Sequence, residues 1–476
     1  MAKLFSDILK GNLFKGDKVV WMIWFLLCMI SLVEVYSASS RMTFNSVTHW
    51  GPMLNHAFFL LVGLGVILII HSIPCKWFML FPIILLPLSF VLLLMTILGQ
   101  GGEMVNGTNR WMSLAGIKFQ PSEIAKASLI MSAAVVLAKT QAEKRYIVRG
   151  REKIVVGAIK GTRYRAFSIV SGMAIIICGL IFADNVSTAL MLFLVIVIMM
   201  FMAHVPIDLM AKGAICLAAI GVVIGSMAIV LPDNTLESIP GMKRVVTVKH
   251  RLLRAMNKSM ADEETVKKQE AEYSKFLESV HKHYRAGSAE EAKAIAEYNK
   301  RKEINELLGD KNSQTTYAKI AVANSNVIGL GPGNSVQRDF LQHAESDFIY
   351  AIIVEELGLV GALFIMMLYI TLLIRCGRIA QKCRRFFPAY LVLGFGLMMT
   401  LQALVNMGVA VGAFPVTGQT LPLISKGGSA ILITSFYIGV ILSVSRYAAA
   451  QAPSKMPEEI HTEGETLEFT TDGAMV

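Results

Sequence analysis

Long apolar stretches recur along most of this 476-residue chain, and they constrain its fold more than any other feature. A helix needs about 17 to 25 residues to cross a hydrocarbon core about 30 Å thick, and these stretches have that length. Hydrophobic residues make up 54% of the chain and charged residues only 17%. We therefore predict an all-α polytopic membrane protein with about ten transmembrane helices. The predicted spans are 19–38, 55–72, 77–98, 122–138, 167–183, 186–204, 211–231, 348–374, 388–408 and 428–446.

The distribution of Lys and Arg in short loops predicts the orientation, because basic loops stay on the cytoplasmic side. Basic residues concentrate in the N-terminal segment, in 139–165 and in 375–385. With ten spans, all three segments and both termini are predicted to lie on the cytoplasmic side of the membrane. No small-residue cleavage site follows the first apolar run, so we expect it to remain as helix 1 of an inner-membrane protein.

The net charge of +11 fits this inside bias and an attraction to anionic lipid. The chain contains no basic patch with interleaved aromatic residues, which is the pattern that would indicate a nucleic-acid surface. The six cysteines form no CxxC pair and have no His neighbours at metal spacing, so we interpret them as packing residues.

One large polar insert, at about 232–347, is predicted outside the membrane between spans 7 and 8. Its middle part, 261–308, has apolar residues at helical spacing, which predicts two amphipathic helices. These helices could dock a partner or lipid head groups, but a solvated hairpin resting on the bundle is the interpretation we favour. Residues 1–450 would form the membrane domain, and 451–476 a disordered cytoplasmic tail.

Polar residues gather at the predicted outer mouth of the fourth span. Glu123 suits the first turn of that helix, and Lys126 shares its face three residues later. A charged pair at membrane depth indicates either a functional site or a buried ion pair that locks two helices. Upstream, Arg110 suits a phosphate, and Trp111 suits either the same site or an interfacial aromatic belt.

Residues suited to binding or catalysis also surround the point where the insert is predicted to re-enter the membrane. The glycines from Gly329 to Gly333 permit close backbone approach, and Arg338 could hold a phosphate. Asp347 stands at the re-entry point, in a partly dry setting that suits a general base, although a helix N-cap is the alternative. His343, Glu345 and Asp347 alternate, so an extended chain would point all three one way, as a hard divalent cation requires.

Two other outer loops carry weaker signals. Asp184 lies in a tight turn between spans 5 and 6, where a turn or cap residue for the next helix is the favoured interpretation. The segment 408–429 contains glycines and prolines that break helix at membrane depth. Such backbone is tolerated where it lines a cavity or is buried in protein, and we favour a cavity lining.

Five ordered segments together resemble the SEDS family (shape, elongation, division and sporulation), which includes FtsW and RodA. They are Val35 to Ser39, Arg110-Trp111, Phe119 to Lys126, Ser346 to Ile349 with Glu355 to Gly358, and Pro415 to Ser429. The resemblance covers nearly the whole predicted bundle. Thr420 favours the FtsW branch, since RodA sequences usually have proline at this position.

The resemblance implies an inverting peptidoglycan glycosyltransferase that polymerises lipid II outside the membrane during septum synthesis. Its implied partners are a class B penicillin-binding transpeptidase and other divisome membrane proteins. Asp347 matches the family's essential aspartate and would take the proton from the acceptor sugar's 4-hydroxyl. The residues assigned to the diphosphate are Arg110, Trp111, Arg338 and Lys426, and those assigned to structure or cavity polarity are Gln120, Glu123, Lys126, Asp184, Glu356 and Ser425.

A divalent cation, Mg²⁺ or Mn²⁺, is implied by the resemblance only, with Asp347 and Glu345 as its candidate ligands. The chain departs from the family in three places: His343 and Glu345 are exchanged, Lys426 replaces a tyrosine, and the insert of roughly 80 residues before Tyr317 is longer than the family's usual loop. A lipid II flippase or transporter, a RodA-type elongation polymerase and a divisome scaffold are the competing interpretations.

Overall fold

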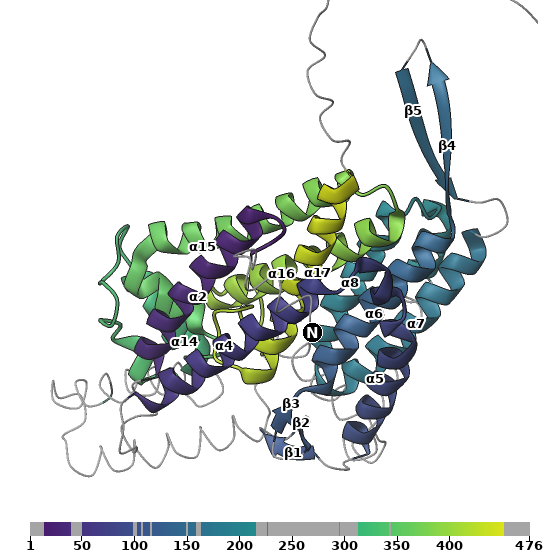
Figure 1. Cartoon of the computed structure of the whole chain (residues 1–476). Coiled ribbons are helices and arrows are strands. Elements are labelled where there is room, and N and C mark those ends of the chain that lie inside the picture. Colours follow the sequence, from purple (N-terminus) through teal and green to yellow (C-terminus); the bar gives the residue numbers. More distant parts are fainter. Residues whose placement is uncertain are drawn as a thin grey trace, which may run out of the picture.

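The computed structural model describes residues 14–39, 50–98, 102–105, 108–114, 117–148, 151–158, 163–215, 313–341 and 344–451, with the single positions 226 and 295. Over these residues the chain is a bundle of apolar helices (Figure 1). Its long helices are α2 (Lys18–Ala38), α4 (Gly51–Ser72), α5 (Phe81–Ile97), α6 (Pro121–Lys139), α7 (Arg163–Asp184), α8 (Val186–Met202), α15 (Ile349–Lys382), α16 (Phe386–Ala410) and α17 (Gly428–Gln451). Shorter helices are η1 (Cys75–Met79), α14 (Ser313–Asn324) and η2 (Gln337–Asp339).

Eight helical segments of the described chain are long and apolar enough to cross a membrane, and α8 is a shorter apolar helix. They coincide with nine of the predicted spans. The remaining predicted span, 211–231, lies outside the described residues apart from 211–215 and position 226. The all-α polytopic fold is thus confirmed, while the count of ten stays a prediction.

The helices divide into a buried centre and a lipid-facing periphery. Most of α6, α16 and α17 is buried, whereas little of α4 and α5 is buried, and both helices expose several large apolar side chains. The main packing pairs are α4 with α17, α15 with α16, and α5 with α6. Exposed apolar side chains suit lipid as the surrounding solvent, so α4 and α5 fit the outside of a membrane bundle.

Local sequence explains where several helices begin. Asp17 caps α2 by accepting hydrogen bonds from the N–H groups of Val19 (2.9 Å) and Val20 (3.3 Å). Pro121 occupies the first turn of α6, where its missing N–H costs no bond. The cap of α8 is Asn185, whose side chain accepts from Ser187 and Thr188. Of the two expectations for Asp184, the cap is therefore wrong by one residue, whereas Asp184 does lie at the tight connection between α7 and α8.

Helix α15 is broken near its N-terminal end at Gly358, which has φ 67° and ψ −169°. Only glycine adopts such a conformation readily. The loop 326–331 satisfies the backbone groups released by the break: Leu330 and Gly331 donate to the carbonyls of Glu355 and Glu356, and Val360 donates to that of Val327. Irregular backbone at membrane depth is tolerated here because neighbouring protein supplies its hydrogen bonds.

Two small antiparallel sheets lie at opposite ends of the bundle (Figure 1). One contains β1 (Gly102–Val105), β2 (Thr108–Leu114) and β3 (Ile117–Phe119), and β2 packs against α5, α6 and α7. The other is a hairpin of β4 (Gln141–Val148) and β5 (Arg151–Ala158) in the basic loop. The sequence analysis predicted neither sheet, although the β-branched runs Ile147-Val148 and Ile154-Val155-Val156 favour strands.

Several predictions concern residues outside the described part of the chain. They include the amphipathic helices at 261–308 and all but the first residue of the tail at 451–476. Of the predicted insert, α14, η2 and the segment that leads into α15 are described. The five described cysteines are free and at least half-buried, as expected of packing residues.

Candidate functional site

The turn that contains Asp347 is anchored at three successive carbonyl groups. The Lys426 N–H donates to the Glu345 carbonyl at 2.8 Å, and the Ser425 hydroxyl donates to the Ser346 carbonyl at 2.5 Å. Asn406 Nδ2 donates to the Asp347 carbonyl at 2.8 Å. These donors come from α16 and from the loop that joins α16 to α17. The backbone of the turn is thereby fixed from the side, while Asp347 itself stays half-buried.

The local geometry changes two expectations for Asp347. Helix α15 begins at Ile349 with Phe348 as its N-cap, so the N-cap alternative for Asp347 is wrong. Residues 344–348 form a turn rather than an extended strand, so alternation does not direct Glu345 and Asp347 to one side. His343 lies outside the described residues. The general-base role of Asp347 stays a prediction.

A polar cavity of about 260 Å³ adjoins this turn. It is lined by Asn55, His56 and Phe59 of α4, by Glu345, and by Lys426, Gly427 and Gly428 at the start of α17. Burial lowers the pKa of the Lys426 ammonium, and the nearby Glu345 carboxylate offsets part of that effect. The cavity thus combines a cation, a carboxylate and the positive end of a helix.

One ring nitrogen of His56 has no hydrogen-bond partner among the described residues. The Ser31 hydroxyl donates its single proton to the Ile424 carbonyl at 2.8 Å, so its oxygen accepts from His56 Nε2 at 2.6 Å. The residue is only 2% exposed, and Nδ1 is buried without a hydrogen-bond partner among the described residues. In the neutral ring, Nδ1 is then an acceptor that no described residue uses, on a side chain that lines the cavity.

Glu355 and Glu356, both fully buried, hold the Gly-rich loop against α15. Glu356 accepts from the N–H groups of Gly333 (2.8 Å) and Ser335 (3.1 Å) and from the Ser37 hydroxyl. Glu355 accepts from the Ser335 hydroxyl and from the N–H groups of residues 336 and 337. Carboxylates that accept several such bonds are well satisfied when buried.

Arg338 faces the protein on the same loop. Its Nη1 donates to the Gly333 carbonyl at 2.6 Å and to the Ser37 hydroxyl at 3.1 Å. These bonds tie the loop to the C-terminal end of α2. Lys426, which lines the cavity, is therefore better placed than Arg338 to contact an anion there.

The predicted Glu123–Lys126 pair is present within α6. Lys126 Nζ donates to Glu123 Oε1 at 2.7 Å and to Gln402 Oε1 of α16 at 3.1 Å. Gln402 Nε2 in turn donates to the Thr420 carbonyl at 2.9 Å. Lys126 is fully buried, so this chain of bonds links two central helices to the loop that carries Ser425. It matches the interpretation of a pair that locks helices.

The other predicted site residues lie around the same end of the bundle. Trp111 is half-buried on β2, and Gln120 is half-buried directly before α6. The Asp184 carboxylate accepts from the Thr96 hydroxyl at 3.3 Å. The side chain of Arg110 lies outside the described part of the structure, so its predicted contact with a diphosphate stays a prediction.

No group of three or more His, Cys, Asp or Glu residues that could hold a metal ion occurs among the described residues. The cation expected from the resemblance would therefore depend on Asp347, on Glu345 and on oxygen atoms of a substrate. Mg²⁺ is commonly bound in this way, through one or two carboxylates and phosphate groups. Because Lys426 already lies near Glu345, Asp347 is the better of the two candidate ligands.

Among the buried polar residues that the sequence analysis did not single out are Glu34, His56, Gln402 and Asn406. Each occurs within a predicted apolar span or at its margin. A polar side chain inside such a span is itself a signal, since it requires a partner or a cavity. Asn406 and Gln402 supply bonds to the site, and His56 lines its cavity.

The fold and this site define a polytopic α-helical membrane protein with a polar cavity and an anchored aspartate at one end of its bundle. The chain belongs to the FtsW/RodA/SpoVE family of cell cycle proteins, which it matches over residues 17–247 and 291–450. The predicted family is thus confirmed.

Curated relatives carry the name probable peptidoglycan glycosyltransferase FtsW. That of Enterococcus hirae is 29% identical over 443 residues, which cover 91% of this chain and 94% of the relative. That of Coxiella burnetii is 26% identical over 434 residues, which cover 89% of this chain and 95% of the relative.

Solved structures share the fold. One match is a chain of a solved structure that bears the description "Structural coordination of polymerization and crosslinking by a peptidoglycan synthase complex". It aligns with a TM-score of 0.62 at 20% identity. That alignment covers 90% of this chain and 98% of the other. The rod shape determining protein RodA of Thermus thermophilus aligns with a TM-score of 0.54 at 18% identity, over 91% of this chain and 98% of RodA.

Proposed function

We propose that this chain is a peptidoglycan glycosyltransferase that polymerises lipid II at the outer face of the cytoplasmic membrane during septum synthesis. The family match and the names of the curated relatives support this class of enzyme. The observation that supports the site is the threefold anchoring of the backbone of residues 345–347, in which Asp347 lies two residues from Glu345, a lining residue of a cavity with a half-buried lysine. A fixed carboxylate and a nearby cation are what glycosyl transfer to a sugar hydroxyl requires.

In the proposed reaction the Asp347 carboxylate accepts the proton of the acceptor sugar's 4-hydroxyl as that oxygen attacks the anomeric carbon of the donor. The bond from the anomeric carbon to the polyprenyl diphosphate breaks, and the configuration inverts. Lys426 and the N-terminal end of α17 stabilise negative charge on the departing diphosphate. A divalent cation, where bound at Asp347, would add Lewis-acid stabilisation of the same charge.

The test uses the purified full chain with lipid II and Mg²⁺ or Mn²⁺, both alone and with its cognate transpeptidase. We expect glycan strands from the wild type and none from Asp347→Asn. Asp339→Asn, an exposed acid on the same outer segment, is the matched control and should polymerise normally. Normal polymerisation by Asp347→Asn would overturn the assignment of the base.

A partner of the class B penicillin-binding transpeptidase type belongs to the same proposal. Support comes from the structural neighbour, which is described as part of a complex that polymerises and crosslinks. The flippase alternative predicts that lipid II crosses vesicle membranes without forming polymer, even with the transpeptidase present. Depletion in cells separates the division role, which gives filaments, from an elongation role, which gives rounded cells.

A further inference from the structure

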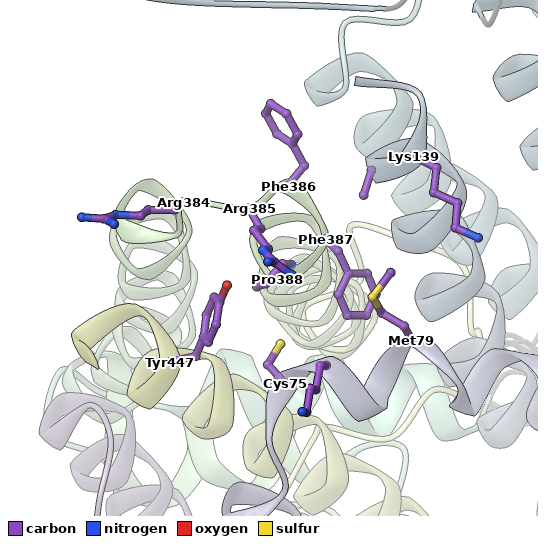
Figure 2. Close-up of a pocket in the computed structure, with 11 residues that line it drawn as sticks. Cys75, Met79, Lys139, Arg384, Arg385, Phe386, Phe387, Pro388 and Tyr447 are labelled. Atoms are coloured by element: carbon purple, nitrogen blue, oxygen red, sulfur yellow. The ribbon is translucent and has the colours of Figure 1, made fainter. Parts of the chain in front are cut away.

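A second hollow region lies at the opposite end of the bundle, where the basic loops gather (Figure 2). Its basic part, of about 330 Å³, lies between η1, the end of α6, the start of α16 and α17. Four cationic side chains line it, namely Lys76, Lys139, Arg384 and Arg385, and no acidic side chain does. None of these four has an ion-pair partner among the described residues. Their charge is therefore available to an anion.

The start of α16 adds to this positive field. Its N-cap is Arg385, no side chain caps the first turn, and that turn contains no acidic residue. The first N–H groups of the helix therefore lack side-chain acceptors, and the helix dipole places partial positive charge beside the basic part. Phe387, Pro388 and Tyr447 close the inner wall (Figure 2).

The hollow continues onto the lipid-facing side of the bundle. An apolar part of about 440 Å³ shares Lys76, Met79 and Lys139 with the basic part. Its other walls are apolar, and three of its residues, Trp77, Leu80 and Ile83, are exposed. A basic recess that opens into an exposed apolar groove matches a molecule with an anionic head and a hydrocarbon chain.

We propose that this region is a binding site for an anionic phospholipid of the adjacent leaflet. The phosphate group lies against Lys76, Lys139 and Arg385, and an acyl chain follows Trp77, Leu80 and Ile83. Basic pockets between transmembrane helices on the cytoplasmic side suit such head groups. The site lies at the other end of the helices from Asp347 and has no part in the proposed transfer step.

Native mass spectrometry of the purified full chain tests this proposal, with phosphatidylglycerol and phosphatidylcholine as probes. We expect one phosphatidylglycerol to be retained in preference to phosphatidylcholine. Lys76→Gln with Arg385→Gln should weaken phosphatidylglycerol retention roughly tenfold or more, because each basic residue near a lipid phosphate contributes on the order of 1 kcal/mol. Asp347→Asn should bind the lipid as the wild type does, even where it forms no polymer.

The matched control is Arg378→Gln with Lys382→Gln, which removes the same charge from exposed residues near the end of α15 that do not line the region. It should bind phosphatidylglycerol as the wild type does. Equal losses in the two double variants would overturn the proposal in favour of a general attraction to the basic face. Equal retention of phosphatidylcholine would overturn it as well.

A charge-preserving variant and a competition experiment test the nature of the site and the identity of its ligand. The charge-preserving variant Lys76→Arg with Arg385→Lys should retain phosphatidylglycerol, and failure to do so would contradict a charge-based site. An equimolar polyprenyl diphosphate should not displace phosphatidylglycerol. If it does, the occupant is the diphosphate lipid rather than a phospholipid, and the proposal fails on the identity of the ligand.

Discussion

The backbones of Gly329 and Gly358 cross so closely that a Cβ on either glycine would lie 2.4 Å from the backbone nitrogen of the other. Both residues have positive φ, 81° and 67°. The crossing brings the Gly-rich loop against the break in α15, where Glu355 and Glu356 accept the N–H groups of that loop. The site at this end of the bundle therefore depends on two positions that admit no side chain.

We expect Gly358→Ala to lower the stability of the folded protein by more than about 2 kcal/mol, because it combines a backbone clash with a strained conformation. Thermal unfolding in detergent measures the effect. Gly377→Ala is the control, since that glycine lies in the regular part of α15 with open space around it. It should leave stability unchanged or raise it by up to about 1 kcal/mol. Equal melting temperatures for the two variants would contradict the crossing.

Lys126→Met should destabilise the bundle by about 3 to 5 kcal/mol, because it leaves the Glu123 carboxylate buried without its cation. The double variant Glu123→Gln with Lys126→Met removes both charges and should recover part of the loss. A double-mutant cycle of unfolding free energies measures the coupling. Additive losses would show that the 2.7 Å pair does not contribute to stability.

Sequence reasoning located the helices well because span length and apolar composition are set by the bilayer itself. It also placed the Glu123–Lys126 pair, since a three-residue spacing within one helix fixes the contact. The cap of α8 and the start of α15 were each misplaced by about one residue, which is the usual limit for helix ends. The two sheets were missed because short strands between spans give little signal beside the hydrophobic pattern.

The parts of the site that sequence could not predict depend on contacts between distant segments. Asn406 reaches the Asp347 carbonyl across 59 positions of the chain, and Lys126 reaches Gln402 across 276. No local pattern encodes such pairs. The family resemblance identified the class of enzyme, which the comparisons support. It also suggested Asp347, whose role stays a prediction, but it did not point to Asn406 or His56.

Asn406→Ala should lower kcat by roughly tenfold to a hundredfold with little change in KM, because Asn406 is a positioning residue for the Asp347 turn. Its Nδ2 donates to the Asp347 carbonyl at 2.8 Å and to the Gln419 carbonyl at 2.7 Å, and the variant loses both bonds. Polymerisation rates measured over a range of lipid II concentrations separate the two constants. Asn324→Ala, at an exposed position at the end of α14, is the control and should behave as the wild type. A change in KM alone would contradict the positioning role.

Lys426 should make polymerisation sensitive to alkaline pH. Burial lowers its pKa, so the side chain loses its proton at a lower pH than an ordinary lysine does. The ammonium is the form that binds a diphosphate, so we expect KM for lipid II to rise as the pH increases through that pKa. Lys426→Arg keeps the charge and should move the alkaline rise in KM to higher pH, whereas Lys426→Gln should raise KM roughly tenfold at neutral pH and abolish the rise. Lys319→Gln, an exposed lysine of α14, should keep the wild-type profile. An alkaline rise that persists unchanged in Lys426→Gln would assign it to another group and remove Lys426 from the diphosphate site.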